Sequence, residues 1–244
     1  MHSKEVIHLE RLDKVIAAMG YLSRREVKEL ARRGRIVVDG APALSPDIKV
    51  DPATSRIEVD GSVLGYTQHT YLLLHKPAGL LTATEDSRQK TVMDLLPQEY
   101  RRRDLSPVGR LDKDTEGLLL LTNDGELNHR LTSPKYHVDK TYYAKVEGTL
   151  SAKDVEAFAR GISLKDFTCL PAKLEILSPS ECIVTVGEGK FHQVKRMLAS
   201  CGTPVTYLKR LTMGPLRLDD TLSAGSFREL TGEEAESLRG CCGL

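Results

Sequence analysis

The sequence predicts an α/β protein in two parts, a small α+β module followed by a larger domain with a mixed, mainly antiparallel sheet. Two observations indicate the small module: paired helical patterns near the start of the chain, and short alternating strands with Asp-Gly turns directly after them. A third observation indicates the larger domain. Its apolar strand segments are not regularly separated by helices, which disfavours a doubly wound parallel sheet.

The helical pattern of the small module runs from Arg11 to Gly34 and is divided by the segment MGYLS. Ser23 and Glu26 fit a capping box at the start of the second helix, and Gly34 is placed to end it. The segments RIVVDG and RIEVDG follow, each reading as a short strand that leads into an Asp-Gly turn.

The remainder of the chain mixes strands and helices. Strands are predicted at YLLLH, GLLLLT, TYYAKVEG, AKLEIL and ECIVTVG, and helices at SAKDVEAFARG and FHQVKRMLASCG. The stretch between the two parts has no strong periodicity. We therefore expect a module over residues 1–62, a linker over 63–69 and a second domain over 70–244.

Charge is balanced over the whole chain but not along it. The net charge is +1, yet residues 24–35 contain six cations and two acids, and residues 187–210 contain five cations and one acid. Local positive patches on a balanced protein are typical of an RNA-binding face, although either patch alone could be a solvated helix surface. Five cysteines without paired spacing fit neither a disulfide framework nor a zinc module, which indicates a reducing compartment. No apolar run approaches the roughly 20 residues that span a bilayer, and the charged amino terminus does not resemble a secretory signal, so we expect a cytoplasmic protein.

The stretch GRLDKDTEGLLLLTNDG, residues 109–125, concentrates charges of both signs before a run of four leucines. Asp112, Asp114 and Glu116 match the start of an EF-hand calcium loop, but Asn123 occupies the position of the bidentate glutamate and the flanks are not amphipathic helices. A second interpretation is a hairpin corner whose charges are merely solvated.

A third interpretation is catalytic. Arg110 and Lys113 flank Asp112, and nearby cations favour the ionised carboxylate that a nucleophile or a base needs near neutral pH. The leucines of the following strand would then anchor the charged loop and hold Asp112 in position.

Five segments of the chain resemble, in order, the motifs of the RsuA-type ribosomal RNA pseudouridine synthases. They are HKPAGLLTAT, GRLDKDTEGLLLLTNDG, SPKYHVDKTYYAKV, VGEGKFHQVKRML and LKRLTMGPLRL. The first 60 residues resemble the small RNA-binding module, first described in a small-subunit ribosomal protein, that this family carries. The resemblance implies a ribosomal-protein-type module joined to a pseudouridine synthase catalytic domain.

The resemblance also implies a chemistry and a catalytic set. The reaction breaks the glycosidic bond of a uridine in RNA, turns the uracil and rejoins it through a ring carbon, without a cofactor or a metal. Asp112 corresponds to the catalytic aspartate, Tyr142 to the tyrosine that packs against the target base, and Lys195 to the basic partner of the aspartate. Many relatives have arginine at that last position, and a lysine offers a point charge instead of a bidentate fork. Attack on the sugar, attack on the uracil and proton abstraction all remain open for Asp112.

Other residues are candidates for RNA contact. Arg110 corresponds to the arginine that fills the space left by an extruded uridine, or it pairs with Asp114 or Glu116. Lys76 contacts phosphate or caps a strand, and His192 is structural or contacts RNA. The cations of the second helical pattern would face phosphates; they are Arg24, Arg25, Lys28, Arg32, Arg33 and Arg35.

The expected partner is ribosomal RNA or a pre-ribosomal particle, with no membrane and no small-molecule cofactor, and a monomeric enzyme. The chain ends in EEAESLRGCCGL, without the basic extension that large-subunit relatives often carry, and this favours small-subunit (16S) rRNA as substrate. The alternatives are a synthase acting on large-subunit (23S) rRNA and a non-catalytic ribosome-assembly factor. A glycoside hydrolase is a more distant alternative, because the chain contains no tryptophan and few aromatic residues for a sugar-binding groove.

Overall fold

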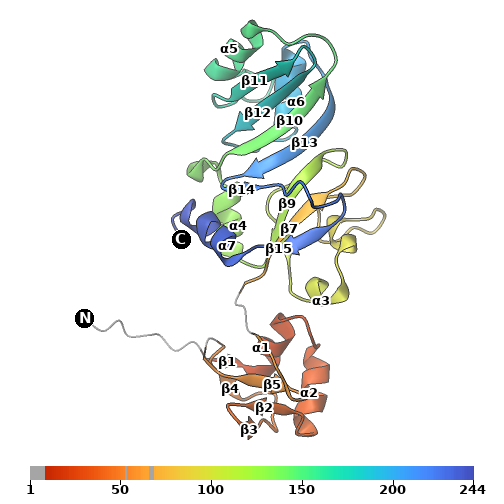
Figure 1. Ribbon diagram of the computed structural model, residues 1–244, viewed down its shortest axis with the longest axis vertical. Coiled ribbons are helices and arrows are strands. Elements are labelled where there is room, and N and C mark those ends of the chain that lie inside the picture. The colour runs from red at the N-terminus through yellow and green to blue at the C-terminus, as the bar shows by residue number, and fades with distance from the viewer. Residues whose placement is uncertain (1–8, 53, 66–68) are drawn as a thin grey trace, which may run out of the picture. The chain divides into compact units, whose positions relative to one another are not determined.

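The computed structural model describes residues 9–52, 54–65 and 69–244, which form two compact units (Figure 1). The amino-terminal unit consists of Met1–Thr70 with Leu96–Leu105. The second unit, named the catalytic unit after the domain that the resemblance implies, consists of Tyr71–Leu95 with Ser106–Leu244. The charged amino terminus over residues 1–8, and residues 66–68 of the expected linker, lie outside the described part of the chain.

The amino-terminal unit contains short strands and helices around its own core. A four-stranded sheet has the order β3-β2-β5-β6, and β1 pairs with β4. The elements are β1 (Glu10–Arg11), α1 (Leu12–Ala18), α2 (Arg24–Arg32), β2 (Ile36–Val38), β3 (Ala41–Pro42), β4 (Lys49–Val50), β5 (Ile57–Val59) and β6 (Ser62–Val63), with α3 (Gln98–Arg101) in the second segment. Apolar residues of α1 and α2 pack on Ile36 and Ile57.

Local sequence signals determine where these elements begin and end. The predicted capping box is confirmed, because the Ser23 hydroxyl accepts a hydrogen bond from the backbone N–H of Glu26 and the Glu26 carboxylate accepts one from the backbone N–H of Ser23. Both Asp-Gly turns have two successive residues with positive φ, as a tight type I′ hairpin turn requires, and they close the β2–β3 and β5–β6 hairpins.

The catalytic unit is built on one large sheet of order β11-β12-β10-β13-β9-β7-β15. In addition, β8 pairs with β9, and β14 pairs with β13. All of its strand pairs are antiparallel except β13 with β9. The strands are β7 (Tyr71–Lys76), β8 (Ser106–Pro107), β9 (Glu116–Thr122), β10 (Lys140–Val146), β11 (Lys173–Ser178), β12 (Glu181–Val186), β13 (Val205–Met213), β14 (Leu216–Arg217) and β15 (Phe227–Glu229). The predicted fold class is therefore confirmed.

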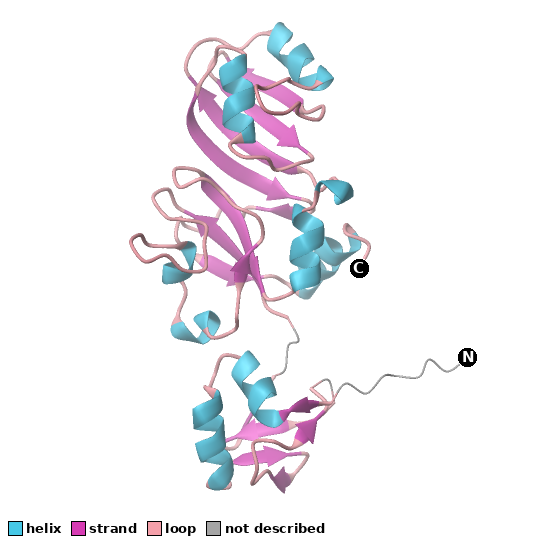
Figure 2. Ribbon diagram, turned by 180° about the vertical axis from the view of Figure 1, so that it is seen from behind, coloured by secondary structure: helices cyan, strands magenta, loops and turns pink. Residues whose placement is uncertain are grey.

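Helices pack on this sheet, and α6 lies on the face turned away from the viewer in Figure 1, toward the viewer in Figure 2. They are η1 (Val92–Leu95), α4 (Gly125–Thr132), η2 (Pro134–Tyr136), α5 (Ala152–Arg160), α6 (Gln193–Ser200) and α7 (Gly232–Gly240). The two predicted helices correspond to α5 and α6. The sequence analysis missed α4 and α7, because each presents few apolar residues at helical spacing to the core.

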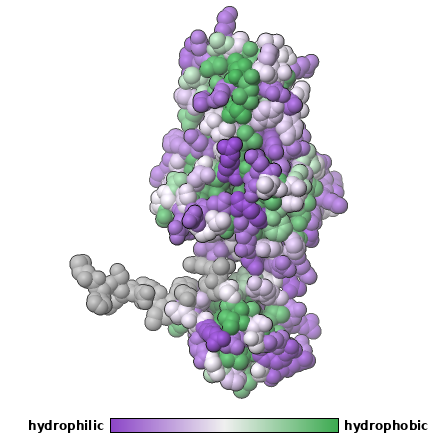
Figure 3. Space-filling view, in the orientation of Figure 1, coloured by the Kyte–Doolittle hydropathy of each residue, from purple (hydrophilic) through white to green (hydrophobic). Residues whose placement is uncertain are grey.

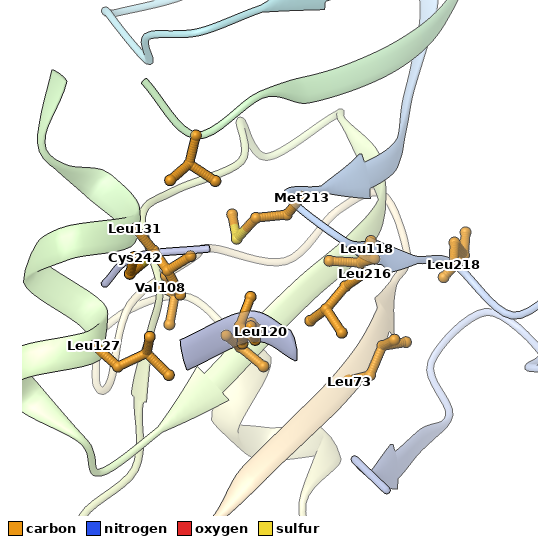
Figure 4. Packing of buried hydrophobic residues seen from close by; sticks show 12 residues of the cluster. Leu73, Val108, Leu118, Leu120, Leu127, Leu131, Met213, Leu216, Leu218 and Cys242 are labelled. Carbon is orange, nitrogen blue, oxygen red and sulfur yellow. The ribbon is translucent and has the colours of Figure 1, made fainter. Parts of the chain in front are cut away.

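Strand β9 lies at the centre of the sheet, between β13 and β7, and Leu118 to Leu121 are fully buried. Leu118 and Leu120 pack with Leu73 of β7 and Met213 of β13 in the core shown in Figure 4. Gly117 allows the parallel contact with β13, since a Cβ there would lie 2.2 Å from a backbone oxygen of the facing residue and φ is +108°. The strand is thus a rigid support for the loop that precedes it.

Figure 3 shows many hydrophilic residues on the face that it views. In the part of the chain that the structure describes, no helix has both the length and the apolar composition to cross a bilayer.

Candidate active site

The loop with the candidate aspartate, residues 109–115, connects β8 to β9 and is held from within the protein. Lys76, the last residue of β7, is fully buried, and its ammonium donates hydrogen bonds of 2.9 to 3.2 Å to four backbone carbonyls. The acceptors are the carbonyls of Pro77, Asp112, Lys113 and Thr115. Three of the four belong to the loop, so the ammonium determines the path of the backbone around Asp112.

Burial lowers the pKa of Lys76 to about 8, although Asp114, Asp112 and Glu116 attract its charge in the opposite sense. Its prediction as a phosphate contact is wrong, because a side chain with no exposed surface cannot reach RNA. The alternative expectation was that Lys76 caps a strand. The structure places it at the end of a central strand, with its side chain directed inward.

Thr82 holds the loop backbone at Leu111, on the other side of Asp112. Its hydroxyl donates to the carbonyl of Leu111 at 2.7 Å and lies 3.2 Å from the backbone N–H of the same residue. The backbone immediately before Asp112 is therefore fixed by one side chain and the backbone immediately after it by another. This is the preorganisation that a catalytic carboxylate needs, because aligning a mobile group would cost entropy.

Lys195, on α6, lies between two carboxylates of the loop. Its Nζ is 3.0 Å from Oδ2 of Asp112 and 2.6 Å from Oδ1 of Asp114. Desolvation of the partly buried ammonium opposes its charge, but the hydrogen bonds to Asp114 and Asp112 outweigh this effect and raise the pKa of Lys195. The same hydrogen bond from Lys195 lowers the pKa of Asp114.

Tyr142 is buried on β10 and lines a small cavity of about 50 Å³ together with Asp112 and Lys195. The neighbouring Tyr143 points to the opposite face of the sheet, where its ring meets that of Tyr207 edge to face at 6.1 Å. Three segments far apart in the sequence thus place a carboxylate, an ammonium and an aromatic ring around one cavity.

His192 and Arg110 border the same aspartate from the solvent side. Nε2 of His192 lies 3.4 Å from Oδ1 of Asp112, an ion pair only when the imidazole is protonated. Arg110 is exposed and forms no hydrogen bond or ion pair with any residue in the described ranges, so its guanidinium is available for a ligand. The alternative pairing of Arg110 with Asp114 or Glu116 is not found, because Lys195 and Tyr207 occupy those carboxylates.

The calcium alternative is not supported by this geometry. The Lys195 ammonium occupies the space between Asp112 and Asp114 that a cation would need, and Glu116 accepts a hydrogen bond from Tyr207 instead. Within residues 9–52, 54–65 and 69–244, no group of three or more histidine, cysteine, aspartate or glutamate side chains is arranged to hold a metal ion.

The cations of the amino-terminal unit form a second candidate surface, on α2. A cleft of about 700 Å³ is lined by Arg24, Arg25, Lys28 and Arg32, which form no ion pair with the described residues. Arg33 pairs with Glu29 and lines an adjoining cleft. The prediction that Arg35 belongs to this helix is wrong. Gly34 has a φ of +67° and ends the helix, so Arg35 lies outside α2, directly before β2, and pairs with Asp60.

Two supporting residues lie in motifs quoted above but were not singled out there. Thr82 lies in HKPAGLLTAT, and its role could not be predicted because it depends on a loop that lies far along the chain. Glu188 is buried beside α6 and accepts hydrogen bonds from the side chain of Gln193 and the backbone N–H of Leu170. In the sequence, Glu188 lies between two glycines and before several cations, a pattern that does not predict a buried carboxylate.

The sheet, the loop and the cavity together form a preorganised site around a carboxylate, and comparisons with known proteins identify the class of enzyme. The family model described as RNA pseudouridylate synthase matches residues 70–200, and the one described as S4 domain matches residues 10–54. A solved structure described as a pseudouridylate synthase is 35% identical and superposes with a TM-score of 0.67, covering 93% of this chain and 99% of that chain. The protein belongs to the RNA pseudouridine synthase family.

Relatives of nearly equal length carry more specific names. An uncharacterized RNA pseudouridine synthase of Bacillus subtilis is 47% identical over 93% of this chain and 98% of its own. The ribosomal small subunit pseudouridine synthase A of Vibrio cholerae is 40% identical, covering 93% and 99% of the two chains. The ribosomal large subunit pseudouridine synthase B of Bacillus subtilis is also 40% identical, covering 95% and 96%.

Proposed function

We propose that this pseudouridine synthase converts a specific uridine of small-subunit ribosomal RNA to pseudouridine, with Asp112 as the catalytic carboxylate. The observation that carries the assignment is the convergence of Asp112, Tyr142 and Lys195 on one cavity from a loop, a strand and a helix. A protein that only bound RNA would have no need for a carboxylate held by an ammonium beside a buried aromatic ring.

Each of the three residues has a distinct task. Asp112, in contact with Lys195, acts on the ribose or the base. Tyr142 presents a ring on which the extruded uracil stacks. Lys195 balances the charge of the carboxylate, and Lys76 and Thr82 hold the loop backbone so that the carboxylate does not have to be aligned during the reaction.

Ribosomal RNA is the substrate class that the names of the relatives support, and the cationic surface of α2 fits a phosphate backbone. The large-subunit synthase of Bacillus subtilis is as similar as the small-subunit enzyme of Vibrio cholerae, so large-subunit RNA is the second candidate. The three proposed catalytic residues belong to one chain, which supports a monomer. The proposed substrate, ribosomal RNA, supports the cytoplasm as the place where the enzyme acts.

The experiment is a comparison of two substrates and two proteins. Transcribed small-subunit and large-subunit rRNA are incubated with the parent and with Asp112→Asn under single-turnover conditions, and pseudouridine is mapped by sequencing. We expect one modified uridine in small-subunit RNA for the parent and none for the variant, with RNA affinity retained. Product only in large-subunit RNA would move the assignment to the second candidate, and variant activity within tenfold of the parent would contradict the role of Asp112.

A further inference from the structure

Phe191 is the most exposed large apolar side chain in the described ranges, with 68% of its surface accessible. Single exposed apolar residues are common on proteins and by themselves need no explanation. What distinguishes Phe191 is its setting, because its ring stacks on the imidazole of His192 with centroids 3.8 Å apart and planes 20° apart. His192 in turn borders Asp112.

The two stacked rings are carried by the turn that leads into α6, and hydrogen bonds hold the backbone of this turn. His192 has left-handed backbone geometry, with φ of +49°, and forms the N-cap of α6. Gln193 holds the preceding turn, since its amide accepts from the backbone N–H of Lys190 and donates to the buried carboxylate of Glu188. A ring mounted in this way loses little conformational freedom when it binds a ligand.

Phe191 also borders a space that the smaller cavity does not include. A cleft of about 510 Å³ is lined by residues 81–83, 109–113 and 189–192, and Asp112 belongs to the walls of both spaces. Tyr142 lines only the small cavity, whereas Phe191 lines only the larger cleft. The aspartate therefore lies between two aromatic surfaces.

The charge of the larger cleft fits a polynucleotide. Arg110 and Lys113 contribute cations to its walls, against the single carboxylate of Asp112, and Lys190 on the same wall is paired with the buried Glu188. An exposed aromatic plane among cations is the arrangement by which proteins bind single-stranded nucleic acid, with bases stacked on rings and phosphates near the charges.

We propose that Phe191, backed by His192, is a stacking platform for an unpaired base that neighbours the target uridine in the RNA. This inference rests on the proposed function, since it takes the small cavity as the site of the uridine. The platform recognises the face of a base and not its edge, so it positions the strand and favours unpaired RNA around the target without reading a particular base.

The kinetic test compares aromatic and non-aromatic side chains at position 191 by the RNA concentration that gives half-maximal rate. Phe191→Ala and Phe191→Leu should raise the RNA concentration for half-maximal rate by roughly 5- to 150-fold, the range that base stacking accounts for. Phe191→Tyr should remain within threefold of the parent. Leu177→Ala, at another exposed apolar position in the catalytic unit, is the matched control and should change nothing. Thermal unfolding of Phe191→Ala should match that of the parent, because an exposed ring contributes little to the core.

The second readout uses the absence of tryptophan from the sequence. Phe191→Trp, combined with Asp112→Asn to prevent turnover, introduces the single tryptophan of the chain. Its emission should be quenched by an oligouridine decamer and by rRNA transcripts. Leu177→Trp in the same background should not respond. Binding is followed in parallel by filter retention.

The outcomes separate the platform from the proposed function. If the parent modifies rRNA and Phe191→Leu matches it, or if RNA binds without quenching Trp at position 191, the platform is wrong and the function stands. If the parent modifies no rRNA but the decamer quenches the fluorophore, the platform stands and the substrate assignment fails. A change of emission with protein concentration in the absence of RNA would identify this face as a protein contact and overturn the proposal.

Discussion

The ammonium of Lys195 lies 3.0 Å from Oδ2 of Asp112, and the two residues come from segments that are widely separated along the chain. The contact joins the loop before β9 to helix α6, so the position of the ammonium beside the carboxylate depends on the packing of that helix. An ion pair in a partly buried site is more than a surface contact, because removing either charge leaves the other poorly solvated.

Lys195→Arg should retain appreciable activity, whereas Lys195→Met should lose more than about 100-fold in single-turnover rate. The methionine variant leaves the carboxylate without its counter-charge and without the hydrogen bond from the ammonium. The rate is measured at saturating rRNA between pH 5.5 and 9. A methionine variant with normal turnover and weakened RNA binding would make Lys195 a phosphate contact instead.

Asp114→Asn should remain within about tenfold of the parent. Asp114 receives the shorter hydrogen bond from Lys195, but its side chain is 75% exposed and solvent can replace the lysine. The ammonium then pairs with Asp112 alone, and the contact between these two residues is preserved. Asp112→Asn, measured in the same assay, is the comparison. Equal loss in the two variants would mean that the carboxylates act as a pair.

Lys76→Met should lower the free energy of unfolding by at least about 2 kcal/mol, because it leaves several buried carbonyls without a donor. It should also reduce the rate at saturating RNA more than tenfold, since the loop around Asp112 loses its support. Lys140→Met is the matched control: Lys140 is buried with a pKa lowered by burial to about 8, but among the described residues it donates only to Val138. The control should lose stability and keep the rate, as measured by urea unfolding and single-turnover assays.

The stability difference between the parent and Lys76→Met should increase as pH rises. Burial lowers the pKa of Lys76 from 10.5 to about 8, so the unfolded chain binds the proton between these values and the folded protein does not. The free energy of unfolding of the parent therefore gains up to about 3 kcal/mol relative to the variant across this window. Urea unfolding at pH 7, 8, 9 and 10 measures the difference. A difference that stays constant or shrinks would mean that Lys76 keeps an ordinary pKa in the folded protein.

Replacing Arg25, Lys28 and Arg32 of α2 with alanine should weaken RNA binding and reduce the slope of log K against log salt by about 2 to 3. These side chains are unpaired among the described residues, so their loss should cost little stability. The matched control replaces Lys153, Arg160 and Lys173, three exposed cations of the catalytic unit. If both triple variants shift the slope equally, binding depends on overall charge and not on this helix.

Much of the fold was predictable because its signals are local. The capping box at Ser23, the two Asp-Gly turns and the apolar run of β9 each depend on residues that are neighbours in the chain. Strand β13 was missed, although it lies at the centre of the sheet, because lysine and arginine interrupt its apolar pattern. Its role arises from its pairing with β9 and β10, which no local pattern encodes.

The sequence by itself determined the order of the motifs and the fold class, because these depend on residue type and spacing, and its family resemblance indicated Asp112, Tyr142 and Lys195 as candidate catalytic residues. The tertiary structure decided which atoms meet. It buried Lys76 under the loop, placed the Lys195 ammonium between Asp112 and Asp114, and left Phe191 exposed beside a cleft. The physical reason is that burial and ion pairing are set by distances between segments far apart in the chain, and those distances follow from how the sheet and α6 pack.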